Sequence, residues 1–166
     1  LCTAASAEEA LELHTVNVIG ERIPPFGVVL EDEGLNARRF STNDTATLLD
    51  GVPGVSFYTG GGVSSLPVIN GFADDRVKIT VDGMSITSAC PNHMNPALSY
   101  IDPSALGQIK VYAGIVPVSQ GGDSIGGAIA VKSAPPSFAK SDEGVKTSGN
   151  ITAFHRSNGS VNGVSI

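Results

Sequence analysis

The 166-residue chain has a net charge of -6 and 41% hydrophobic residues, with a mean hydropathy of +0.13. This composition excludes a chain that is disordered throughout, because such chains combine low hydrophobicity with high net charge. No apolar run approaches the roughly 18 residues of a membrane-spanning helix, and no cluster of Lys and Arg offers a surface for nucleic acid.

The first seven residues have the features of the end of a secretory signal peptide. Residues 1–7 are apolar and small, and Ala-Ser-Ala at 5–7 fits the A-x-A cleavage pattern. The alternatives are an ordinary Ala-rich N-terminus and a lipoprotein anchor at Cys2, which the bulky Leu1 before it disfavours. After cleavage Cys90 is the only cysteine left, so this exported chain cannot form an internal disulfide.

Residues 8–39 predict an extended, poorly packed N-terminal arm, because they are polar and charged with few apolar clusters. Within the arm, residues 13–19 alternate polar and apolar side chains and are rich in β-branched residues, which predicts a strand. Pro24 and Pro25 then prevent a helix from continuing through this part of the chain.

Residues 40–136 predict a compact domain of short elements. One helix is expected over 46–49, after the capping residues 41–44, and another over 97–100, with Asn95 as N-cap and Pro96 as the first helical residue. A tight turn is expected at Asp82-Gly83. Short strands are expected at 55–58, 66–69, 76–81, 108–112 and 128–132. Mixed short strands and helices indicate an α+β fold.

Residues 137–166 differ from the compact domain. The first part, 137–147, is polar and charged and predicts a linker. Residues 148–156 then alternate, Asn158-Gly159 predicts a hairpin turn, and 161–166 resume the alternation. We expect the start of an antiparallel β region that this sequence truncates.

Three segments resemble the plug domain of TonB-dependent outer-membrane receptors in residues, order and spacing. They are residues 48–55 (LLDGVPGV), residues 69–72 with 76–83 (INGF and RVKITVDG), and residues 109–114 continuing through 126–131 (IKVYAG and GGAIAV). The resemblance covers about residues 40–133. Two positions depart from the family pattern, since Asn70 stands where arginine is usual and Gly121 stands where an aromatic residue is common.

The resemblance implies an α+β fold in which a small mixed β-sheet plug, with short helices and long loops, precedes the first strands of a transmembrane β-barrel. It also implies a location in the outer membrane of a Gram-negative bacterium. The plug would then lie inside the lumen of its own barrel, with the N-terminus in the periplasm. Arg76 is expected to contact the barrel wall, and a surface pair with Asp82 is the other assignment for this residue.

The resemblance further implies that residues 13–19 are a TonB box, which a periplasmic TonB protein engages by strand addition to a sheet edge. The alternative is an ordinary strand of a small sheet. The segment consists of Leu13, His14, Thr15, Val16, Asn17, Val18 and Ile19.

Residues 90–96 (CPNHMNP) contain the lone mature thiol, one of three histidines and one of two methionines. Thiolate and thioether sulfurs are soft ligands, which favour Cu(I) over Mg²⁺, Ca²⁺ or Mn²⁺. Cys90 and Met94 are four positions apart, so one helical turn would place them on one side. The alternative is that both residues pack as ordinary hydrophobic side chains.

This segment also resembles the outer-membrane copper receptors of the same family. In that subgroup a Cys-x-x-x-Met pair in the plug supplies two ligands, and a His-x-Met pair in the barrel supplies the others. The resemblance implies that Cys90 and Met94 are plug-side ligands for Cu(I), carried as cargo. His93 lies between the matching positions and either supports the ligands or points away from them.

Other glycine-rich and histidine-containing stretches do not indicate an enzyme. Residues 60–62 lack the lysine of a phosphate-binding loop, and Ile125 interrupts a serine-protease-like pattern at 122–127. His14 and His155 have no partners at ligand spacing. Two other functions remain open: a plug for a siderophore or haem receptor, and a freestanding plug-like module for binding or signalling.

Overall fold

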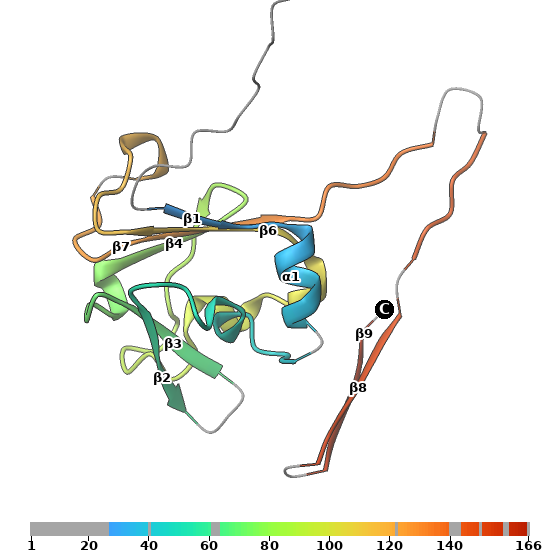
Figure 1. Ribbon diagram of the computed structural model, residues 1–166, viewed down its shortest axis with the longest axis horizontal. Coiled ribbons are helices and arrows are strands. Elements are labelled where there is room, and N and C mark those ends of the chain that lie inside the picture. The colour runs from blue at the N-terminus through green and yellow to red at the C-terminus, as the bar shows by residue number, and fades with distance from the viewer. Residues whose placement is uncertain are drawn as a thin grey trace, which may run out of the picture.

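The computed structural model describes residues 27–39, 41–60, 64–121, 123–139, 144–149, 151–157 and 160–165. The predicted signal-peptide remnant at 1–7 and the predicted TonB box at 13–19 lie outside these ranges. The described residues form one five-stranded sheet and two separate two-stranded pairs (Figure 1). None of the helices in these ranges has the length and apolar character needed to cross a membrane.

The five-stranded sheet has the order β1-β6-β7-β4-β5. Its strands are β1 (Gly27–Leu30), β4 (Val77–Val81), β5 (Met84–Ser85), β6 (Leu106–Ala113) and β7 (Gly127–Ser133). β4 pairs parallel with β7, whereas the other neighbours are antiparallel. A parallel pair needs a long crossover connection, and here the crossover contains β5, β6 and the loop with Cys90 and Met94.

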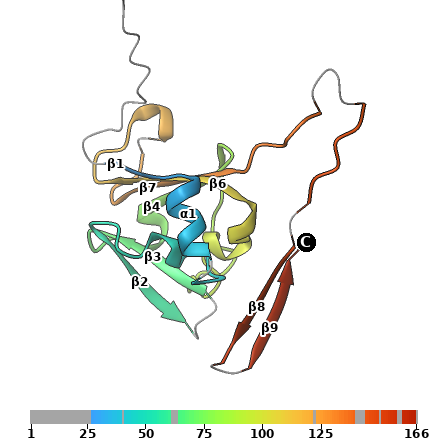
Figure 2. The same ribbon diagram turned by 45° about the vertical axis from the view of Figure 1, so that its right-hand side comes forward.

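The α-helix, part of the 3-10 helices and the β2–β3 pair lie over one face of this sheet, whereas the 3-10 helix near residue 120 lies on the other side, as the two views in Figures 1 and 2 show. The α-helix is α1 (Asp32–Arg39), and the 3-10 helices are η1 (Ala46–Leu49), η2 (Asp74–Arg76), η3 (Ala97–Tyr100), η4 (Pro103–Ala105) and η5 (Val118–Gln120). The two antiparallel pairs are β2 (Val55–Gly60) with β3 (Ser64–Ile69), and β8 (Thr152–Arg156) with β9 (Val161–Ser165).

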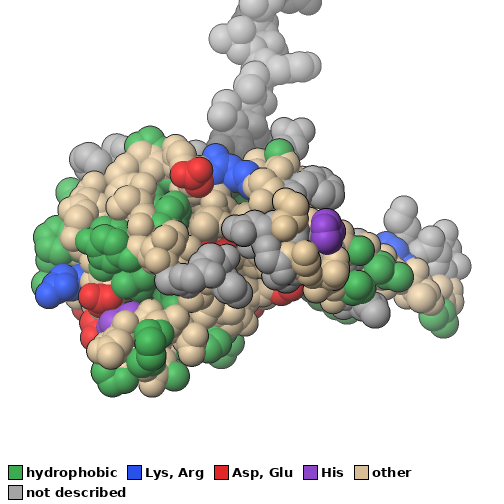
Figure 3. All heavy atoms as spheres, turned by 90° about the horizontal axis from the view of Figure 1, so that it is seen from below, with side chains coloured by type: hydrophobic (Ala, Val, Ile, Leu, Met, Phe, Trp, Pro, Cys, Tyr) green, Lys and Arg blue, Asp and Glu red, His purple; other side chains and the backbone are tan. Residues whose placement is uncertain are grey.

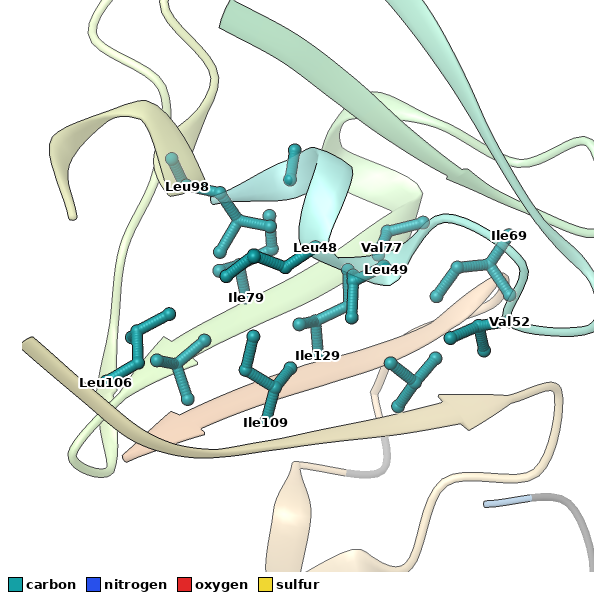
Figure 4. Packing of buried hydrophobic residues seen from close by; sticks show 14 of the residues in the cluster. Leu48, Leu49, Val52, Ile69, Val77, Ile79, Leu98, Leu106, Ile109 and Ile129 are labelled. Atoms are coloured by element: carbon teal, nitrogen blue, oxygen red, sulfur yellow. The ribbon is translucent and has the colours of Figure 1, made fainter. Parts of the chain in front are cut away.

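The core lies between the sheet and the helices α1, η1 and η3. Leu48 and Leu49 of η1 and Leu98 of η3 are fully buried against the sheet (Figure 4). The sheet contributes Val77, Ile79, Leu106, Ile109 and Ile129 to the same cluster. Each buried aliphatic side chain contributes about 1.5–3 kcal/mol of hydrophobic stabilisation, so this layer fixes the short helices on the sheet.

Two tight turns have positive φ at both central residues, as type I′ turns require. At Asp82-Gly83 the φ angles are 50° and 83°, which confirms the predicted turn. At Asn70-Gly71 they are 49° and 83°. Asn tolerates this conformation better than most residues, so the departure from the family pattern at Asn70 has a backbone explanation.

The N-terminal boundary of the compact domain was predicted incorrectly. Residues 27–39 were assigned to a poorly packed arm, but β1 joins the main sheet through β6 and Leu35 of α1 is fully buried. The compact part therefore includes residues 27–39, which the prediction left outside it. The helices at 46–49 and 97–100 were placed correctly, although Pro96 is extended and precedes the second one.

The strands near the C-terminal end match the prediction of an antiparallel β region. β8 and β9 pair in register from Thr152 with Ser165 to Arg156 with Val161. The predicted turn at Asn158-Gly159 lies outside the described residues.

Candidate functional site

Cys90, His93 and Met94 lie in the loop of residues 86–96, which connects β5 to η3. The His93 amide donates a hydrogen bond to the Cys90 carbonyl at 2.9 Å, which closes a β-turn. Pro91 occupies the second position of this turn, where its fixed φ is favourable. Residues 90–93 therefore form a β-turn and not the turn of helix that the four-residue spacing suggested.

Two serine hydroxyls hold the backbone of this loop. Ser88 Oγ lies 3.2 Å from the Cys90 carbonyl oxygen and 2.9 Å from the Asn95 carbonyl oxygen. Ser64, at the start of β3, donates from its Oγ to the Met94 carbonyl at 3.0 Å. The chain is therefore anchored on both sides of the turn by groups that do not use the sulfur atoms.

The two sulfur-bearing side chains differ in exposure. Cys90 is a free thiol and is half-buried, whereas Met94 is 66% exposed. Within the described ranges, neither sulfur atom forms a hydrogen bond. The same ranges contain no group of three His, Cys, Asp or Glu side chains that could hold a metal ion. The loop on its own thus offers two soft donors.

His93 is less exposed than Met94. Its side chain is only 17% exposed, and its Nε2 lies 3.8 Å from Asp74 Oδ1 of η2. Both residues have positive φ, 49° for His93 and 60° for Asp74, which costs a non-glycine residue about 1–2 kcal/mol. The structure therefore places the His93 ring beside Asp74 of η2.

His93 lines a cavity of about 230 Å³ between the loop and β4. Lys78 and Asp123 also line it and form an ion pair at 3.0 Å. The hydrogen bond from Lys78 lowers the pKa of the Asp123 carboxyl. On the face seen in Figure 3, a histidine lies among acidic and hydrophobic side chains at one end of the molecule.

Arg76 ends η2 with an exposed side chain, and its carbonyl accepts hydrogen bonds from the Gly126 amide at 2.8 Å and from Ser124 Oγ at 3.0 Å. The alternative pair with Asp82 does not occur. The Asp82 carboxylate instead accepts from the Ser133 amide at 2.9 Å and from Ser133 Oγ at 2.6 Å. These hydrogen bonds lower the pKa of Asp82.

Sequence reasoning missed the residues that support the loop. Ser64 is 30 residues from its acceptor at Met94, and nothing in the local pattern predicts that contact. Asp74 likewise reaches His93 only through the fold. Ser88 lies two residues before Cys90, and its proximity to the motif is the one signal that was present.

The fold and this loop define the class of protein. The profile of the TonB-dependent receptor plug domain matches residues 29–128, which begin within β1 and end within β7. The chain therefore belongs to the TonB-dependent receptor plug domain family.

The solved structures that are similar to this chain include a copper transporter, a siderophore receptor and a hemophore receptor. The copper transporter OprC is 26% identical with a TM-score of 0.59, over 78% of this chain and 18% of that chain. The siderophore receptor PirA from Acinetobacter baumannii is 18% identical with a TM-score of 0.54, over 69% of this chain and 18% of that chain. The hemophore receptor HasR of Serratia marcescens is 20% identical with a TM-score of 0.57, over 68% of this chain and 17% of that chain.

The last two similarities concern the fold alone. The chain spans less than a fifth of the length of each of these receptors. A sequence comparison with curated proteins gives no significant match.

Proposed function

We propose that this chain is the plug of an outer-membrane receptor that imports copper, with Cys90 and Met94 as the plug-side ligands for Cu(I). The observation that carries the proposal is the anchored loop, which presents a thiol and an exposed thioether whose sulfur atoms form no hydrogen bond within the described residues. Thiolate and thioether ligands select Cu(I) among the common metals. The 26% identity to the copper transporter OprC supports the same assignment.

Two soft donors do not complete a Cu(I) site, so the proposal requires further ligands from the barrel. A His-x-Met pair facing the plug would fit, because imidazole and thioether both bind copper. His93 is not needed as a ligand in this arrangement, since its ring lies beside Asp74. Copper is cargo here, so binding must be strong enough for capture and weak enough for release.

The remaining parts of the chain have roles in this proposal. Residues 13–19 are the TonB box through which a periplasmic TonB protein opens the plug by strand addition. Arg76, which is exposed, contacts the wall of the barrel. The β8–β9 pair is the first hairpin of that barrel, in the outer membrane of a Gram-negative bacterium.

The proposal is tested by Cu(I) titration of the purified full receptor against a colorimetric Cu(I) chelator. Cys90→Ala and Met94→Ala are each expected to lower the Cu(I) affinity at least tenfold, because each removes one soft donor from the site. Met84→Ala is the matched control, since Met84 is 65% exposed and lies outside the loop. Wild-type affinity in both loop variants would refute the copper assignment.

A siderophore or haem receptor is the second candidate, because the same fold occurs in PirA and HasR. Under this alternative, a ferric siderophore or haem binds the full receptor while Cu(I) binding is unaffected by Cys90→Ala. A barrel without a His-x-Met pair would favour the same alternative.

A further inference from the structure

Ser88 occupies a special place at the base of the loop. Its hydroxyl lies within hydrogen-bond distance of two carbonyl oxygens, that of Cys90 at 3.2 Å and that of Asn95 at 2.9 Å. A serine hydroxyl has a single hydrogen to donate, so the two carbonyls share it. One side chain thereby ties together the residue that carries the thiol and the residue that follows Met94.

Two further hydrogen bonds hold the backbone of the loop. The Cys90 carbonyl also accepts the His93 amide at 2.9 Å, and the Met94 carbonyl accepts Ser64 Oγ at 3.0 Å. The Met94 side chain nevertheless remains largely exposed. Hydrogen bonds thus hold the backbone at both candidate ligands, while the Met94 side chain is exposed and the Cys90 side chain is half-buried.

We propose that Ser88 is a positioning residue for the Cu(I) ligands, holding Cys90 and Met94 at the separation that a shared metal ion requires. The inference depends on the proposed copper function. Without the hydroxyl, the ends of the loop separate more freely, and metal binding must then restrict them again. The hydrogen bonds that orient metal ligands contribute to affinity in this way in other metal sites.

The test measures the Cu(I) affinity of the full receptor for wild type, Ser88→Ala, Ser88→Thr and Cys90→Ala. Ser88→Ala is expected to weaken Cu(I) binding about fivefold, the effect of losing one hydrogen bond. Ser88→Thr keeps the hydroxyl and is expected to restore the affinity. The matched control is Ser41→Ala, which removes a similar hydroxyl-to-carbonyl hydrogen bond, to Arg38 at 2.6 Å, away from the loop.

A melting temperature for each variant separates positioning from general stability. The inference holds if Ser88→Ala loses affinity while its melting temperature stays close to that of Ser41→Ala. It is overturned if Cys90→Ala loses affinity but Ser88→Ala binds like wild type, or if Ser88→Thr binds as weakly as Ser88→Ala. If Cys90→Ala itself binds like wild type, the copper function has failed and this inference fails with it.

Discussion

Gly127 begins β7 with a φ of 140°, a conformation that side chains rarely adopt. A Cβ at this position would lie 2.3 Å from the carbonyl oxygen of Tyr112, on the neighbouring strand β6. Real Cβ atoms do not approach backbone so closely, so β7 could accept a side chain here only by moving away from β6. Glycine at 127 is thus required by strand pairing as well as by backbone conformation.

Gly127→Ala is expected to lower the free energy of unfolding by about 3 kcal/mol or more, because backbone strain and a steric clash combine. Gly114→Ala is the control, since Gly114 has a φ of 97° but no atom within 4 Å of an added Cβ. Its expected loss is about 1–2 kcal/mol from strain alone. Urea unfolding of both variants tests this difference, and equal losses would contradict it.

At the scale of residues, the sequence indicated which side chains make up the candidate site but not the local geometry of the loop that carries them. Cys90 and Met94 were recognisable because few other side chains offer soft donors. The β-turn between them was missed, although Pro91 is favourable for one, because the four-residue spacing fits a helix equally well. His93 lies beside Asp74, which is 19 positions earlier in the sequence, so only the fold brings the two side chains together.

Among the elements, α1 and β1 show how a distant partner changes the interpretation of a segment. In residues 27–39 a short apolar run, Val28 to Leu30, is followed by a mostly polar and charged stretch, and the segment was predicted to be an arm. β1 becomes ordered because it pairs with β6, where Gly27 is opposite Tyr112 and Leu30 is opposite Ile109. The strands at 76–81, 108–112 and 128–132 were predictable because alternation and β-branched residues are local signals.

Leu35→Ala in α1 is expected to lower the free energy of unfolding by about 3 kcal/mol, since Leu35 is fully buried and its truncation leaves a cavity. Ile115→Ala removes a side chain of similar size that is 72% exposed, and a change below about 0.5 kcal/mol is expected. Chemical unfolding of the two variants compares them directly. If Leu35→Ala were as stable as Ile115→Ala, α1 would not be part of the folding unit.

For the whole molecule, the proposed receptor depends on an N-terminal segment that reaches TonB. Val16→Pro is expected to abolish TonB-dependent copper accumulation, because proline lacks the amide donor that strand addition uses. Val16→Thr keeps this donor and a β-branched side chain, so it should retain accumulation. Cellular copper is measured at matched receptor levels, with and without TonB.

If the Val16→Pro variant accumulates as much copper as the wild type, residues 13–19 are not the segment that TonB contacts. Copper accumulation that is equal with and without TonB in the wild type would remove energy coupling from the proposal altogether.

The parallel pairing of β4 with β7 also determines when the plug can form during synthesis. Val77 pairs with Gly127, and β7 lies between β4 and β6 in the sheet. Closing such distant pairs costs chain entropy before contacts compensate for it, which is why folds rich in them fold slowly. A growing chain that ends before β7 lacks the strand that joins β4 to β6. We therefore expect the five-stranded sheet to form only after β7 has been synthesised, and the loop with Cys90 and Met94, which belongs to the crossover, to take its final position at that stage.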